Sequence, residues 1–111
     1  MDYIKTINED LSFEVGLGAT QAVGSDRYPF YIAELCKNGV IGLYVPEAHF
    51  KRDWTEGSQE VAKFDPSKKA TQFIRKSYGH WWECERDGKK IRRFNGYLKF
   101  GQACSYLDPE F

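Results

Sequence analysis

Residues 29–45, PFYIAELCKNGVIGLYV, decide the fold class of this chain. Two runs rich in aromatic and β-branched residues, 29–36 and 40–45, flank the tripeptide at 37–39. Asn38-Gly39 tolerates the positive φ of a tight turn, so the stretch predicts an antiparallel β-hairpin. Pro46 then ends the second strand or marks an edge, because proline has no amide hydrogen to donate.

Similar short apolar runs, separated by turn residues, continue on both sides of this hairpin. Turn signals stand at 16–18, 24–27, 77–79, 87–88 and 95–96. Asp87-Gly88 and Asn95-Gly96 are typical of hairpins, so we expect the strand after each to return beside the strand before it. The predicted strands are 12–15, 19–23, 60–64, 70–76, 80–85, 89–94 and 97–100.

The middle of the chain, residues 49–69, is polar and is predicted to be a long connection. Helical periodicity is absent elsewhere, and the one candidate for a helical turn is 46–56, where Pro46 could start it. The tail, 101–111, contains Asp108-Pro109 and is expected to fold back on the body. About six to eight strands without crossover helices indicate an all-β, mainly antiparallel fold, either a small SH3-like barrel or a compact sandwich with long loops.

The composition is that of one soluble domain. The chain has 111 residues, of which 41% are hydrophobic and 16% aromatic, so we expect a single β domain over 1–111 with a core rich in rings. Residues 1–11 are expected to be a loosely attached N-terminal segment. No apolar run approaches the roughly 20 residues of a membrane span, and the charged start predicts no signal peptide. A cytoplasmic location, away from membranes, is therefore expected.

Three cysteines, Cys36, Cys84 and Cys104, are spaced without a C-x-x-C pair. An odd, sparse set predicts neither a disulfide framework nor a zinc site. We expect three reduced thiols, no bound metal and no cofactor.

The net charge of zero excludes histone-like and strongly acidic, DNA-mimicking proteins, but it hides an asymmetry. The window 63–100 carries eleven basic against four acidic residues, interleaved with rings. Such a surface favours an anionic, stackable ligand, because arginine pairs with phosphate and rings stack on bases. The alternative is an ordinary solvated face, with Glu83 and Glu85 pairing nearby cations. The candidate binding residues are Arg75, Lys76, Tyr78, Trp81, Trp82, Arg92 and Arg93.

Trp81 and Trp82 are adjacent, so on a strand they face opposite sides of the sheet. One is expected in the core, and the other is expected to be covered by a loop, a partner or a ligand. His80 is interpreted as a surface turn residue.

Catalytic signatures are missing from the sequence. There is no G-x-S-x-G elbow, H-E-x-x-H, phosphate-binding Walker loop or C-x-x-C, and Gly16-Leu17-Gly18 is followed by Ala19-Thr20 instead of the remainder of a dinucleotide fingerprint. On a strand, His80 and Cys84 lie about 13 Å apart, beyond the reach of a nucleophile–base pair. We expect a protein that is not an enzyme.

Five pieces in order resemble a family of small, functionally uncharacterised bacteriophage and prophage proteins. They are Val15 to Thr20, Ser25 to Pro29, Ile32 to Leu35, Gly79 with Trp81, and Tyr106 to Phe111. The family pattern has a basic-Asp-Gly turn before the tryptophan, where this chain has Ser77-Tyr78-Gly79.

The resemblance implies a phage accessory protein acting in the bacterial host cytoplasm, and carries over no catalytic residues. We expect non-catalytic binding that antagonises host defence, by sequestering a nucleotide-type ligand or by capping a defence protein. The alternative is a nucleic-acid-binding module for phage replication or transcription. Near-zero net charge predicts weak or no binding to nucleic acid. The sequence does not distinguish a monomer from a homo-oligomer.

Overall fold

The computed structural model of the chain describes residues 13–50 and 57–107. Over these residues the structure is all-β, and ten strands belong to one antiparallel sheet. The strands are β1 (Gly18–Val23), β2 (Asp26–Leu35), β3 (Ile41–Tyr44), β4 (Ala48–Phe50), β5 (Ser58–Val61), β6 (Gln72–Ser77), β7 (His80–Cys84), β8 (Lys90–Arg93), β9 (Tyr97–Phe100) and β10 (Ser105–Tyr106). A 3-10 turn, η1 (Lys37–Gly39), connects β2 to β3.

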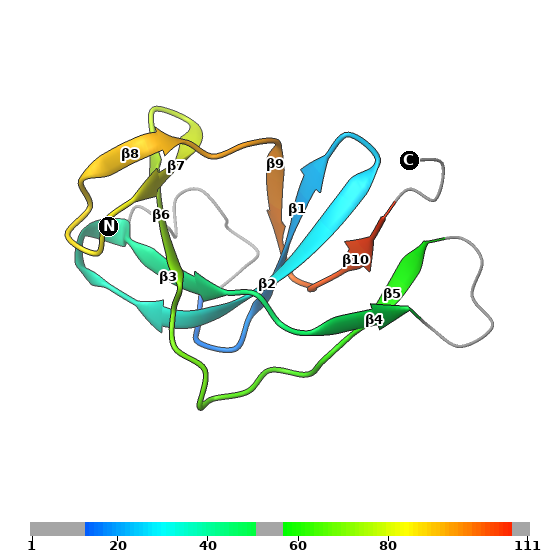
Figure 1. Cartoon of the computed structure of the whole chain (residues 1–111). Coiled ribbons are helices and arrows are strands. Elements are labelled where there is room, and N and C mark those ends of the chain that lie inside the picture. The colour runs from blue at the N-terminus through cyan, green and yellow to red at the C-terminus, as the bar shows by residue number, and fades with distance from the viewer. Residues whose placement is uncertain (1–12, 51–56, 108–111) are drawn as a thin grey trace.

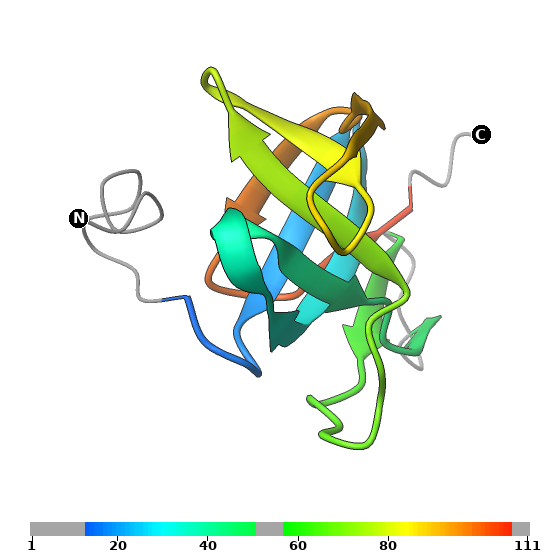
Figure 2. The same ribbon diagram turned by 90° about the vertical axis from the view of Figure 1, so that its left-hand side faces the viewer.

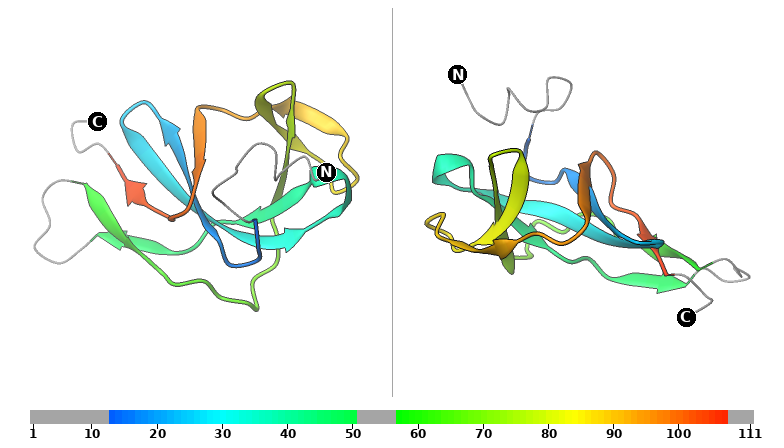
Figure 3. Two further views of the ribbon diagram at one scale, coloured as in Figure 1. Left: turned by 180° about the vertical axis from the view of Figure 1, so that it is seen from behind. Right: turned by 90° about the horizontal axis from the view of Figure 1, so that it is seen from above.

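Strand β2 is the long central strand that joins the parts of the sheet (Figure 1). One edge of β2 pairs with β1, and β1 pairs with β9 on its other edge. The other edge pairs with β10 at Arg27 and with β3 from Tyr31 onward, and β3 continues into β6, β7 and β8. Figure 3 shows β4, β5 and β10 gathered at one end of the molecule and β6, β7 and β8 at the other.

The sheet curls until its two halves face each other across the core. Figure 2 shows β6 and β7 lying in front of β1 and β9. Between these layers lie buried side chains, among them Ile32, Leu43 and Ile74, each without exposed surface. The ring of Trp81 on β7 lies 5.4 Å from that of Phe100 on β9, measured between centroids, so contact between rings joins the two halves. The result is a compact antiparallel sandwich.

The sheet does not close into a barrel, so the SH3-like alternative is wrong. Within the described residues β8 pairs with β7 alone, and β9 pairs with β1 alone. The Asn95-Gly96 hairpin expected between β8 and β9 is also wrong. Phe94 is 6% exposed and packs on Phe30 in the core. Because its burial is favourable, the chain crosses the sandwich after β8, and β9 pairs with β1 instead of β8.

Three local expectations are confirmed and three are wrong. The turn at Asn38 has φ 60°, the turn at Tyr78 has φ 52°, and Gly88 has φ 96°, as tight turns require. Residues 13–15 form no strand, although close by the amide of Gly16 donates to the carbonyl of Ile32, and the amide of Ile32 donates to the carbonyl of Leu17. Residues 48–50 form a strand instead of a helical turn, because β5 offers an antiparallel partner to β4. The ten strands of the described residues exceed the expected number, since β4 forms by pairing with the next strand, β5, and the short β10 forms by pairing with the distant β5 and β2.

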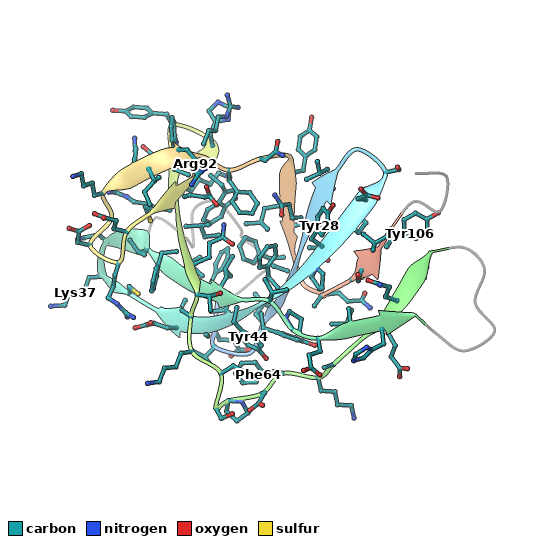
Figure 4. All side chains as sticks on the ribbon, viewed as in Figure 1. Tyr28, Lys37, Tyr44, Phe64, Arg92 and Tyr106 are labelled. Atoms are coloured by element: carbon teal, nitrogen blue, oxygen red, sulfur yellow. The ribbon has the colours of Figure 1, made fainter. Side chains whose placement is uncertain are left out.

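The tail returns to the body as expected, for the part that the structure describes: Tyr106 pairs with Arg27, and Ser105 pairs with Gln59. On the far side of β2 and β3, Tyr31, Tyr44 and Phe64 form a second aromatic cluster, with Tyr44 and Phe64 side by side in Figure 4. Predictions for 1–12, for 51–56 and for 108–111, including the loosely attached segment 1–11, lie outside the described residues.

Candidate functional site

A pocket opens where the curled sheet fails to close, between the edge strands β8 and β9, and we call this unpaired line the seam. It lies between the β6–β7 turn, the crossing from β8 to β9, and the start of β9, and its volume is about 470 Å³. We call it the seam pocket. Its lining combines cationic side chains, rings and glycine backbone: Lys76, Gly79, His80, Trp81, Arg93, Phe94, Gly96, Tyr97 and Leu98.

Close packing of the backbone shapes one wall of this pocket. Gly96 has φ 70°, and a Cβ built there would lie 2.1 Å from the carbonyl oxygen of Ala22. Only a residue without a side chain fits between the crossing and the end of β1. The side-chain amide of Gln21 donates to the carbonyl of Asn95 at 2.8 Å and fastens the same crossing to β1.

Two cationic side chains and a histidine surround the opening. Arg93 Nη2 lies 2.6 Å from His80 Nδ1, and since a guanidinium only donates, the ring nitrogen accepts this hydrogen bond. Lys76 Nζ lies 5.8 Å from the centroid of the Trp81 ring. No aspartate or glutamate is among the lining residues, so the described lining is electropositive.

The two tryptophans lie on opposite sides of β7, as alternation predicted. Trp81 packs against the core, on the rings of Phe13 and Phe100. Trp82 is half-buried on the outer face, where Lys90 Nζ lies 4.9 Å from its ring centroid. Lys90, a lysine of the same chain, is therefore the group that covers the Trp82 ring. The indole nitrogen of Trp82 donates to the carbonyl of Ser77 at 3.2 Å.

The structure brings Lys76, Trp81 and Arg93 together and directs two other predicted arginines elsewhere. Arg92, labelled on β8 in Figure 4, is bound to Glu83 at 2.6 Å, as the solvated-face interpretation expects. Arg75 points to the β7–β8 turn, with Nη1 3.5 Å from the carbonyl of Gly88. These two side chains lie outside the lining of the seam pocket.

The remaining predicted residues lie on the outer face of the β6–β7–β8 layer. Tyr78, at the tip of the β6–β7 turn, is 92% exposed, and Lys90 Nζ lies 5.4 Å from its ring centroid. We call Tyr78, Trp82, Lys90 and Arg93 the outer strip. Arg93 belongs to both the outer strip and the seam pocket.

Sequence reasoning missed three large side chains of the pocket wall and the part that His80 takes in the lining. Phe94, Tyr97 and Leu98 enter the lining because β9 pairs with β1 and comes to face β7. His80, interpreted as a surface turn residue, is exposed directly after the β6–β7 turn as expected, and it also lines the pocket beside Arg93. Adjacency to Trp81 was the one signal that pointed to His80, since no local pattern reports contacts across a seam.

Other parts of the molecule offer less to a charged ligand. A second hollow of about 490 Å³ is lined by Thr20, Arg27 and Lys99 among others, but Arg27 Nη1 is already bonded to the carbonyls of Gly24 and Asp26. Burial raises the pKa of the Cys84 thiol, and all three cysteines are unpaired with one another. The described residues contain no cluster of three metal-ligating side chains.

Comparison of the chain with protein-family models, with curated proteins and with solved structures gives no match. The described residues contain no helix that is long and apolar enough to cross a bilayer.

Proposed function

We propose that the chain is a non-catalytic binding protein whose seam pocket holds a nucleotide-type anion. The observation that carries the proposal is one pocket where Lys76, His80 and Arg93 meet the rings of Trp81 and Tyr97 without a carboxylate in the lining. Cations without neighbouring acids are available to an anion, and rings beside them offer stacking surface to a base.

Each half of a nucleotide has a matching group at this site. The planar guanidinium of Arg93 presents paired donors for phosphate oxygens, with His80 at 2.6 Å holding it in place. Tyr97 is 83% exposed at the pocket rim, where its ring is accessible to a base. A volume of about 470 Å³ lies within the range of small-molecule sites, roughly 300–1,000 Å³.

The biological role we propose is antagonism of bacterial host defence by a phage-encoded protein in the host cytoplasm. It is supported by the sequence resemblance, and the pocket adds a means: sequestration of a nucleotide signal. A second candidate is capping of a defence protein. The exposure of Tyr78 and Tyr97, 92% and 83%, favours it, because exposed rings are frequent anchors of protein interfaces.

Isothermal titration calorimetry with the four nucleoside monophosphates, the free nucleosides and inorganic phosphate tests the binding proposal. We expect at least one monophosphate to bind more tightly than its nucleoside and than phosphate, because both halves contribute. Arg93→Ala should weaken that binding by roughly 2–4 kcal/mol, since a buried phosphate loses a charge-assisted partner. Tyr97→Ala should cost roughly 1–3 kcal/mol through lost stacking.

Arg92→Ala is the matched control. Arg92 is the neighbouring residue on the same strand and has the same charge, but it binds Glu83 outside the pocket. We expect nucleotide affinity to remain within about twofold of the parent, an energy change of less than about 0.5 kcal/mol. Equal losses in the two arginine variants, or no binding by any monophosphate, would refute the proposed site.

Plaque formation tests the role. Bacteria carrying a nucleotide-signalled defence system are infected while expressing the parent chain or Arg93→Ala. We expect the parent chain alone to restore plaques, and mass spectrometry of the purified protein to find a bound nucleotide. Plaques restored equally by Arg93→Ala, with a defence protein co-purifying, would favour capping over sequestration.

A further inference from the structure

We infer that the ligand is a short single-stranded oligonucleotide, which places one nucleotide in the seam pocket and the next on the outer strip. This inference rests on the proposed function and deepens it by naming the ligand class. Its basis is that the pocket and the strip are one continuous surface joined at Arg93.

A β-bulge in β8 creates that continuity. Lys90 lies opposite Cys84 and Arg93 lies opposite Trp82, although regular alternation would send residues 90 and 93 to different faces. The register shift between Glu83 and Cys84 absorbs one residue of β8 and puts both cations on the face of Trp82. A ligand whose first phosphate binds Arg93 can therefore place its next phosphate at Lys90 on the same face.

The outer strip supplies a second stacking platform that is already organised. Lys90 Nζ lies between two rings, 5.4 Å from the centroid of Tyr78 and 4.9 Å from that of Trp82. The hydrogen bond from the Trp82 indole to Ser77 fixes the larger ring. A base on the exposed ring of Tyr78 and a phosphate on Lys90 reproduce the pairing of stacking with charge that single-stranded ligands require.

The charges on this layer favour a polyanion on one face. Glu83 is the only acidic residue of β6, β7 and β8, and it lies opposite Ile74 and Arg92, on the side that faces the core. Among the residues of these three strands, the outer face thus carries Arg75, Lys90 and Arg93 and no carboxylate. Because the path turns from the pocket over the edge of the sheet, it fits a flexible single strand better than a stiff duplex.

Calorimetry with a series of 5′-phosphorylated ligands tests the inference. The series contains one, two and three adenylate residues, in ribose and deoxyribose forms, with a short duplex for comparison. We expect the dinucleotide to bind about 5- to 150-fold more tightly than the mononucleotide, the range that one added stacked base gives. The duplex should bind no more tightly than the mononucleotide.

Two variants locate the added affinity on the outer strip. Tyr78→Asn removes the exposed ring and keeps a residue that tolerates the observed φ of 52°, and Lys90→Ala removes the cation. We expect both to lose most of the dinucleotide gain while binding the mononucleotide within about twofold of the parent. Lys90→Ala should also reduce the salt slope of dinucleotide binding by about 0.7. The control is Lys68→Ala, an exposed lysine on the β5–β6 connection, which should retain both affinities.

The outcomes separate this inference from the proposed function. Equal affinity for the mononucleotide and the dinucleotide overturns the inference and leaves the pocket proposal standing. A dinucleotide gain that survives in both strip variants also overturns it. If no member of the series binds, the proposed function fails and the inference fails with it.

Discussion

Replacing Gly96 by alanine is the sharpest test of how the seam is built. Gly96 has φ 70°, and a Cβ at this position would lie 2.1 Å from the carbonyl oxygen of Ala22 and 3.1 Å from the side chain of Val23. The left-handed backbone costs a residue with a Cβ about 1–2 kcal/mol. Overpacking against backbone that cannot move freely adds roughly 1–3 kcal/mol. We therefore expect Gly96→Ala to lower the free energy of unfolding by about 2–5 kcal/mol.

Gly79 provides a matched control on the other side of the same pocket. Its φ is 79°, close to that of Gly96, but a Cβ there would meet no atom within 4 Å. Gly79→Ala should therefore cost only the backbone part, about 1–2 kcal/mol. The difference between the two variants isolates the close approach of the crossing to β1.

Urea denaturation at equilibrium, followed by tryptophan fluorescence, measures the free energy of unfolding of both variants, and unchanged m-values would make the two energies comparable.

Asparagine at the same two positions gives a second pair of variants, because asparagine tolerates a left-handed backbone and still carries a Cβ. Gly79→Asn should recover much of the loss, and Gly96→Asn should recover little. If the two alanine variants are equally destabilised, the seam is not fixed by contact between Gly96 and Ala22, and our account of the pocket wall is wrong.

Further predictions concern a ring, a carboxylate and a thiol. Trp81→Ala should destabilise the domain by roughly 3 kcal/mol in the same urea assay, because a half-buried ring is lost from the core, whereas a cost below about 1 kcal/mol would contradict that placement. Hydrogen bonds from the side-chain hydroxyl and then the backbone amide of Ser67 lower the pKa of the Asp65 carboxyl. The ionised carboxylate therefore stabilises the fold fully above its unfolded pKa, and this contribution is lost as the pH falls below about 4. In melting curves recorded at a series of pH values, the melting temperature of Asp65→Asn should fall less steeply with acid than that of the parent chain. Cys84 is 4% exposed and burial raises its pKa, so Ellman's reagent should modify it only after unfolding; modification in the native state, located by peptide mass spectrometry, would contradict the burial.

The sequence by itself determined the local features of this protein. Asn38-Gly39, Tyr78-Gly79 and Asp87-Gly88 stand at turns because positive φ is a property of the residue and its neighbours. Alternation was likewise enough to place Trp81 and Trp82 on opposite faces, since successive residues of any strand point apart. The all-β class followed from these signals together.

The tertiary structure alone decided how the hairpins pair with one another and with the remaining strands, and which charges meet. Asn95-Gly96 has the sequence of a hairpin, but burial of Phe94 takes β9 to β1 and leaves the seam open. Among similar arginines, Glu83 binds Arg92, and the strand register places Arg93 opposite Trp82 on the other face. Such choices depend on partners that lie between 9 and 81 residues away along the chain, and their free energies are set by packing and register rather than by local propensity. The candidate site is therefore a product of the curled sheet, even though its residue types are visible in the sequence.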